Sequence, residues 1–188
     1  MQRTTTAGRG VARRRFLAGV AAGQLATASA ARATGVEEEK MKVAVGSDHA
    51  GFSLKGAVVQ LLRSWGYTVS DVGTQSVEPV DFPDITRKVC DEILAGRAQR
   101  GVVIGGTGAG ACIAANKMPR IRAVLCHDTY SAHECVEHDD ANVLCLGAWI
   151  VGSKLVEEIL PAFLNAKFIS TDADFQRRLR KVAEMEKR

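Results

Sequence analysis

Several features that would assign a chain of this size to a familiar class are missing from its sequence. The five cysteines are an odd number and include no Cys-x-x-Cys pair, which argues against a framework of disulfide bonds. No apolar run is long and strong enough to stay across a bilayer. The glycine-rich stretch at residues 105–110 lacks the residue order of the dinucleotide-binding fingerprint. We therefore expect no disulfide-stabilised domain, no stable membrane anchor and no NAD site.

A common zinc motif is missing as well. Three histidines and a cysteine fall close together, at His127, His133, Cys135 and His138. Their spacing matches no common zinc pattern, so we expect no metal.

Acidic residues are absent from the first 33 residues, which contain six arginines. The run Arg13–Leu17 (RRRFL) resembles a twin-arginine export motif, and an uncharged stretch and two small-x-small cleavage sites follow it. We predict a signal peptide at 1–33 and a polar lead-in at 34–41. The twin-arginine translocase would then export the protein, which would be periplasmic or secreted. The alternative is a start at Met41, which would make the protein cytoplasmic.

The basic character of the chain is mostly a property of this leader. Six of the 25 lysines and arginines lie in it, so the remainder has 19 basic and 21 acidic residues and a net charge of −2. The charge therefore gives no argument for a nucleic-acid partner. About 155 residues remain, which is enough for one domain, at 42–188.

Short apolar stretches alternate with amphipathic ones from Lys42 onward. Strands are expected at 43–45, 67–72, 102–104, 121–126 and 142–146. Helices are expected at 52–65, 83–94, from 109–111 onward, 130–137, 153–164 with Ser153 as N-cap, and 174–186. This order predicts an α/β fold, a parallel sheet covered by helices on both faces.

The glycine loop, Gly105–Gly110, separates the third strand from the third helix. Glycines let a backbone approach a ligand closely, and unpaired amides at a helix N-terminus favour an anion. That anion would be a phosphate, a carboxylate or an enediolate formed during a reaction. The simpler interpretation is a tight strand–helix junction.

Polar residues follow the predicted strands. Asp48 and His49 follow the first strand, Thr107 lies in the glycine loop, and His138 and Asp139 precede the fifth strand. We expect them to converge at the carboxyl edge of the sheet, where ligands of such folds bind. The alternatives are that Asp48 only caps a turn and that His138 only favours a helix C-terminus.

Four motifs together carry a family resemblance. They are Ser47–Gly51, Asp81–Pro83, Gly106–Lys117 and His138–Leu144. In order and without large gaps, they resemble the ribose-5-phosphate isomerase B family, which includes the galactose-6-phosphate isomerase subunits. The resemblance implies a Rossmann-like, three-layer fold with a five-stranded sheet and a C-terminal helix. It also implies a cofactor-free aldose–ketose isomerase that works through an enediolate, as a homodimer or dimer of dimers with shared active sites.

The same resemblance implies roles for individual residues. Asp48 and His138 match positions that handle sugar hydroxyls and ring opening, and Thr107 matches a residue near the ring oxygen. His49 and Arg178 match residues at the phosphate end. The amides that match the enediolate cradle are those of Gly106, Gly108, Ala109 and Gly110.

The catalytic base of the family is not where the resemblance would put it. One branch has a cysteine where this chain has Gly105, and another has a glutamate where it has Ala111. Cys112 is the nearest ionisable group, at a helix N-terminus that would stabilise a thiolate, so we take it as the candidate base. The alternative is that its side chain points into the core.

The phosphate end departs from the family too. Asp174 and Trp149 stand where arginines are usual, and Asp139 replaces an asparagine. Fewer cations and more carboxylates suit a neutral sugar better than a dianion, and an indole can pack on its C–H face. The alternative is an alignment slip near Asp174, with Arg177 and Arg180 binding the phosphate.

Three functions follow. The first is an isomerase of a small sugar that need not carry a phosphate group. The second is a non-catalytic sugar-binding protein that kept the pocket and lost the base. The third is an ordinary sugar-phosphate isomerase whose start codon was assigned too early.

Overall fold

The computed structural model describes residues 41–187, so the predicted signal peptide and nearly all of the lead-in lie outside the described residues. The strands are β1 (Lys42–Ser47), β2 (Thr68–Asp71), β3 (Arg100–Gly105), β4 (Ala123–Leu125) and β5 (Val143–Gly147). The helices are α1 (Phe52–Ser64), α2 (Phe82–Leu94), α3 (Ala109–Ala115), α4 (Thr129–Asp139), α5 (Ser153–Asn165) and α6 (Ala173–Met185). All the predicted elements are present, and most of their ends lie within two residues of the prediction.

The five strands form one parallel sheet in the order β2-β1-β3-β5-β4. The chain moves outward from β1 to β2 and then returns to β3 on the other side. The switch point of the sheet therefore lies between β1 and β3, where ligands of open α/β sheets bind. Ser47 pairs with Ile104 and Gly105 with Gly147, so the residues after β1, β3 and β5 leave the sheet at the same edge. The predicted fold class is confirmed.

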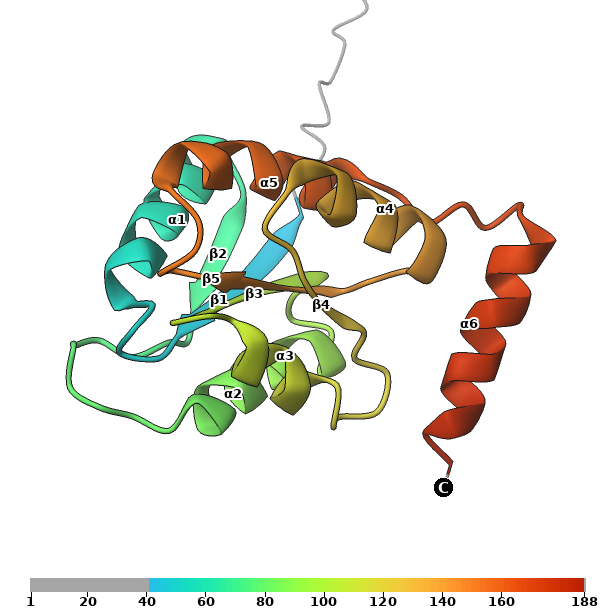
Figure 1. Ribbon diagram of the computed structural model, residues 1–188, viewed down its shortest axis with the longest axis horizontal. Helices are drawn as coiled ribbons and strands as arrows, with labels where there is room; N and C mark the ends of the chain where they lie inside the picture. Colours follow the sequence, from blue (N-terminus) through green and yellow to red (C-terminus); the bar gives the residue numbers. More distant parts are fainter. Residues whose placement is uncertain (1–40, 188) are drawn as a thin grey trace, which may run out of the picture. The chain divides into compact units, whose positions relative to one another are not determined.

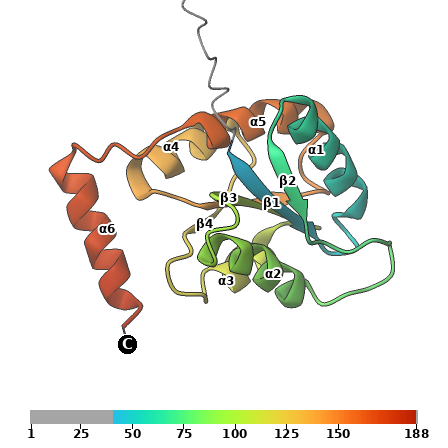
Figure 2. The same ribbon diagram turned by 180° about the vertical axis from the view of Figure 1, so that it is seen from behind.

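Helices cover both faces of the sheet (Figures 1 and 2). One face packs against α1, α4 and α5 through a core that includes Leu62, Val136 and Phe163. The other face packs against α2 and α3, with Val89 and Ala115 in its core. Nearly all residues of β1, β3 and β5 are buried, which is why these strands are continuous apolar runs in the sequence.

Helix α6 stands beside these layers and packs against α4 (Figure 1). None of its residues is buried, and Val182 and Met185 are exposed. Asp172 caps its N-terminus by accepting from the amides of Asp174 and Phe175. Among residues 41–187, no helix has the length and hydrophobicity needed to cross a membrane.

One predicted cap is wrong. Ser153 is the first residue of α5, and the N-cap is Gly152, which makes no side-chain cap bond. Glycine is itself an acceptable N-cap residue, and the cap lies one position earlier than expected.

Candidate active site

The glycine loop is held against β5 by close backbone contacts. Gly108 has φ 76°, and a Cβ there would lie 2.7 Å from the carbonyl group of Leu146, so glycine is required on two counts. Within residues 41–187, the amides of Thr107, Gly108 and Gly110 donate to no other group. Because α3 has only seven residues, these loop amides, more than a helix dipole, are what the loop offers to an anion.

Asp48 lies beside this loop. One oxygen, Oδ1, accepts from the amide of Gly51 at 3.0 Å, which confirms that Asp48 caps its turn. The other, Oδ2, faces Gly105 and is 3.3 Å from where a Cβ on that glycine would be. A Cβ on Gly51 would collide with the backbone of Ile104 in β3, so the turn is packed against the neighbouring strand. Both contacts fix Asp48 at the switch point.

Trp149 packs against the loop at Gly106. The amides of Ala148 and Trp149 donate to the carbonyl oxygens of Gly105 and Gly106, at 2.8 and 3.0 Å. The indole ring lies over Gly106, where three ring atoms are 2.7–2.9 Å from the position of a Cβ. Trp149 is nevertheless 73% exposed, so its other face is open to solvent. A ligand that reaches the loop would therefore meet an apolar surface.

The remaining predicted loop residues are accessible. Thr107 and Ala109 are exposed, and the Thr107 hydroxyl accepts weakly from the Ala109 amide, at 3.4 Å. Gly110 faces the ring of Phe82, whose atoms are 3.0–3.3 Å from the position of its Cβ. Phe82 thus limits the loop on the side of α2.

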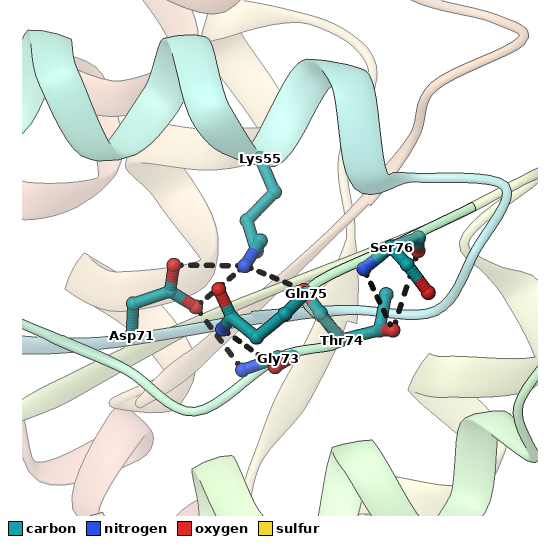
Figure 3. Close-up of polar contacts among 6 residues, drawn as sticks. All are labelled: Lys55, Asp71, Gly73, Thr74, Gln75 and Ser76. Carbon is teal, nitrogen blue, oxygen red and sulfur yellow. Dashed lines mark hydrogen bonds and ion pairs between the residues drawn. The ribbon is translucent and has the colours of Figure 1, made fainter. Parts of the chain in front are cut away.

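His49 points toward the segment after β2. Its Nδ1 accepts from the amide of Val80 at 3.3 Å. The start of that segment is anchored by Lys55, which is 2% exposed and whose Nζ donates at 2.8 Å to both oxygens of Asp71 and to the carbonyl of Thr74 (Figure 3). A buried ammonium group with three acceptors is fully paired, so the start of this segment is held rigidly next to the site.

His127 is a residue that the sequence reasoning did not assign to the site. It follows β4, separated from the strand only by Cys126, and is half-buried. Its Nε2 accepts from the amide of Gly147 at 3.2 Å, and a Cβ on Gly147 would touch the carbonyl of Thr107, so His127 lies close to the glycine loop. The signal was its position after a predicted strand, the same rule that selected Asp48.

Cys112 has different surroundings. Its thiol is 3.4 Å from the carbonyl oxygen of Ala123, and the Asn116 side-chain amide donates to the thiol at 3.6 Å. A hydrogen bond with the thiol of Cys145 is the main reason why the pKa of Cys112 falls to about 7. Among the described residues, no side-chain partner of Cys112 belongs to the glycine loop. Cys112 as the base stays a prediction, and these contacts give it no support.

The expected convergence of all polar residues at one edge is wrong for a single chain. His138 lies at the end of α4, before β5, and therefore at the amino ends of the strands. From Val143 to Gly147 the strand spans about 13 Å at about 3.3 Å per residue. A helix that follows a parallel strand returns the chain to the starting edge of the sheet, so a residue at the end of α4 cannot lie beside Asp48 of the same chain.

The outer cluster consists of His138, Asp139, Asp174 and Arg178. The His138 ring packs 4.4 Å from that of Phe175 and its Nε2 is 2.9 Å from Glu134. Asp174 forms ion pairs with Arg177 and, at 3.4 Å, with Arg178. Asp139 and Arg178 line one groove of about 700 Å³ beside α6. The outer cluster is thus held together, but away from the glycine loop.

One group in α4 has the composition of a metal site. Ligand atoms of His133, Glu134 and Glu137 lie within 4.8 Å of one another. His133 is already paired with Glu137 at 3.0 Å, and Glu134 with His138. Since these pairs account for all three groups, we assign no metal to them.

Comparisons with known proteins agree with this geometry. The family model described as ribose/galactose isomerase matches residues 43–182. Ribose-5-phosphate isomerase B of Escherichia coli is 42% identical over 127 residues, 68% of this chain and 85% of that protein. D-erythrulose-4-phosphate isomerase of Pectobacterium atrosepticum is 40% identical over 129 residues, again 68% and 85% of the two chains. The structure of Clostridium thermocellum ribose-5-phosphate isomerase B has a TM-score of 0.76 and 44% identity, and the match covers 78% of this chain and 98% of that one.

Proposed function

Because the chain belongs to the ribose/galactose isomerase family, we propose that it interconverts the aldose and ketose forms of a small sugar through an enediolate, without a cofactor. Family members similar in sequence and in structure carry the names of sugar-phosphate isomerases. Membership in the family supports isomerase activity. The choice of substrate and the catalytic groups are specific to this proposal.

The observation that carries the proposal is the glycine loop beside Asp48 and Trp149, in which Thr107 and Ala109 are exposed. Free amides of the loop can bind an oxyanion that forms during reaction, and a carboxylate lies within reach of the same space. A protein that only binds a sugar has no need for an oxyanion site. The loop therefore favours a reaction over binding alone.

The outer cluster completes the site of a second copy of the chain. His138 and Arg178 match family positions that handle the ring and the distal end of the substrate, yet within one chain they lie at the opposite edge from Asp48. An isologous dimer brings unlike edges of two copies together, and each substrate then meets both sets. This corresponds to a homodimer, or a dimer of dimers, with shared active sites.

The substrate is a sugar without a phosphate group. Asp174 pairs with both Arg177 and Arg178, so these two cations of the helix already have an anionic partner. The hydrogen bond and the charge of Arg177 hold the pKa of Asp174 below its usual value, so it is ionised near neutral pH and repels a dianion. Trp149 offers an apolar face in place of a cation. Free hydroxyl groups can donate to Asp139 and Asp174 instead.

Two other functions have specific support. The names of the relatives point to sugar phosphates, which favours an ordinary sugar-phosphate isomerase. The absence of an ionisable side chain at Gly105 and at Ala111, which is buried, favours a non-catalytic sugar-binding protein. Both alternatives are decided by the same pair of measurements.

Proton exchange in deuterated water, followed by NMR, tests catalysis. Free and phosphorylated tetroses, pentoses and hexoses are each incubated with the purified protein lacking residues 1–33, and exchange at C1 or C2 is expected for at least one. Binding without exchange would indicate the sugar-binding protein. Calorimetry with ribose and ribose 5-phosphate tests the substrate class, and tighter binding of the phosphate would refute the unphosphorylated substrate. Trp149→Arg with Asp174→Arg should move the preference toward the phosphate.

The protein acts outside the cytoplasm, after export by the twin-arginine translocase and removal of residues 1–33. This rests on the Arg13–Leu17 motif, which lies outside the described residues. Replacing Arg13 and Arg14 by Lys should leave the precursor in the cytoplasm. A wholly cytoplasmic native protein that starts at Met41 would contradict export.

A further inference from the structure

The glycine loop has no ionisable side chain of its own, so the proton that moves during isomerisation needs a base from a neighbouring strand end. Four ionisable side chains, besides the buried Cys126 thiol, follow the ends of β1 and β4. They are Asp48, His49, His127 and Asp128, and both oxygens of Asp128 already accept from Ser131.

The two histidines each have one ring nitrogen engaged as a hydrogen-bond acceptor. Nδ1 of His49 accepts from the amide of Val80, and Nε2 of His127 accepts from the amide of Gly147. In a neutral imidazole the second nitrogen then carries the hydrogen, so it donates and cannot accept a proton. As placed here, both rings are donors toward a ligand.

Asp48 is arranged in the opposite way. Oδ1 is held by the Gly51 amide, while Oδ2 has no hydrogen-bond partner among residues 41–187. Oδ2 faces the α-carbon of Gly105, at 3.3 Å from the position that a side-chain Cβ would take. The missing side chain at Gly105 therefore leaves space directly in front of a free carboxylate oxygen.

From this geometry we infer that Asp48 is the base of the reaction, with Oδ2 acting in the space that Gly105 leaves open. The inference rests on the proposed isomerase function and names the group that the glycine loop lacks. A side chain at position 105 would be in tight contact with Oδ2, so glycine there and a carboxylate base at 48 are two parts of one arrangement.

The proton balance is simple. Oδ2 of the Asp48 carboxylate takes the proton from C2 of the open-chain aldose, and the C–H electron pair becomes the C1–C2 double bond of an enediolate. The negative charge moves to O1, next to the free loop amides. The Asp48 carboxylic acid then returns the proton to C1, and a hydroxyl proton moves from O2 to O1 to give the ketose. No oxidant, metal or cofactor takes part.

Asp48→Asn is the decisive variant, because its amide oxygen can still accept from Gly51 and keep the turn. We expect proton exchange to fall at least about a hundredfold, as is typical for loss of a general base, with little change in sugar binding. Asp91→Asn, an exposed carboxylate on α2, is the matched control and should exchange at the native rate.

The probe must separate proton abstraction from ring opening, which is the other role for Asp48. D-erythrulose and its 4-phosphate have too few carbons to close a stable ring, so neither needs ring opening. Loss of exchange with these sugars supports the base. If Asp48→Asn loses exchange only with ribose or ribose 5-phosphate and keeps it with erythrulose, the inference is wrong.

If erythrulose is too short to bind, a second variant tests whether Asp48 is the base. Gly105→Cys in the Asp48→Asn background places a thiol where the carboxylate acted, and exchange with ribose or ribose 5-phosphate should recover at least about tenfold. No recovery in a folded double variant would overturn the inference. If the native protein exchanges no sugar at all, the isomerase proposal itself fails, and that result is distinct from failure of Asp48 alone.

Discussion

The carboxyl edge of the sheet and the outer cluster hold polar groups in different ways. At the carboxyl edge, Asp48 and the glycine loop are fixed by backbone hydrogen bonds and by contacts in which a Cβ would collide. In the outer cluster, Asp174 and Arg178 are held by exposed ion pairs on a helix with no buried residue. The first arrangement changes only if the fold changes, whereas the second can change by single substitutions.

Under the proposed function, this difference separates the chemistry of the reaction from the choice of substrate. Reacting atoms need groups held to within fractions of an ångström, which the rigid edge provides. The distal end of a substrate needs only complementary charge and shape, which exposed side chains can supply. The glycine loop belongs to the first arrangement, together with Trp149, which packs on Gly106, and Asp174 belongs to the second. The four predictions below test it, from the largest expected effect to the smallest.

Lys55→Met should destabilise the fold strongly. The substitution leaves the Asp71 carboxylate, 23% exposed, and the Thr74 carbonyl without their cation, and we expect a loss of about 3 kcal/mol in the free energy of unfolding. Denaturant titration measures it. Lys154→Met, which breaks an exposed pair with Glu157 at 2.9 Å, is the control and should cost less than about 0.5 kcal/mol. Equal losses in the two variants would remove the distinction between anchored and surface ion pairs.

Gly108→Ala should damage the loop and the fold together. A left-handed backbone costs a non-glycine residue roughly 1–2 kcal/mol, and the contact with the Leu146 carbonyl adds to it. Thermal unfolding and proton exchange should both decline. Gly152→Ala, whose Cβ would meet open space, should leave exchange unchanged. Full exchange in Gly108→Ala would show that the loop is not rigid.

Cys112 should ionise near pH 7. The hydrogen bond with Cys145 lowers its pKa to about 7, so its thiolate fraction and its rate of alkylation by iodoacetamide should rise through that pH. Burial raises the pKa of Cys90 to about 11, so this thiol stays protonated near pH 7 and should not be alkylated there. Cys145→Ala should move the midpoint upward, toward that of an ordinary thiol. A midpoint that does not move in that variant would contradict this cause.

The same alkylation experiment shows whether Cys112 takes part in the reaction. Alkylation that leaves proton exchange intact would show that the thiol takes no part in the reaction. Exchange lost in step with alkylation, and in Cys112→Ser, would restore the thiol as the base.

Subunit mixing should show that the two regions work across an interface. Asp48→Asn and His138→Ala are each expected to be nearly inactive. Refolded together in equal amounts, half of the dimers are mixed, and one of their two sites has both native halves, so about a quarter of native activity returns. No recovery would mean that a single chain supplies both regions.

The sequence was sufficient for the layers and the loop because each rests on local rules. Runs such as Val102–Ile104 are apolar throughout because both faces of the sheet are covered, and glycines mark the turn that follows. His138 was placed at the wrong edge because its motif is near β5 in sequence, whereas its position depends on the direction of α4. The contact between Asp48 and Gly105 joins residues 57 apart in number, and nothing local predicts that distance.

The order of the strands also affects how the chain is made. β4 leaves the ribosome before β5, yet its strand partner in the sheet is β5, which in turn pairs with β3. Until Val143–Gly147 has been synthesised and inserted, β3 is a bare edge and β4 has no partner. Nascent chains that stop short of Gly147 therefore expose two apolar strands with open hydrogen bonds, the state that other strands capture most readily. The sheet is complete, and its strands are protected from aggregation, only when β5 has inserted between β3 and β4.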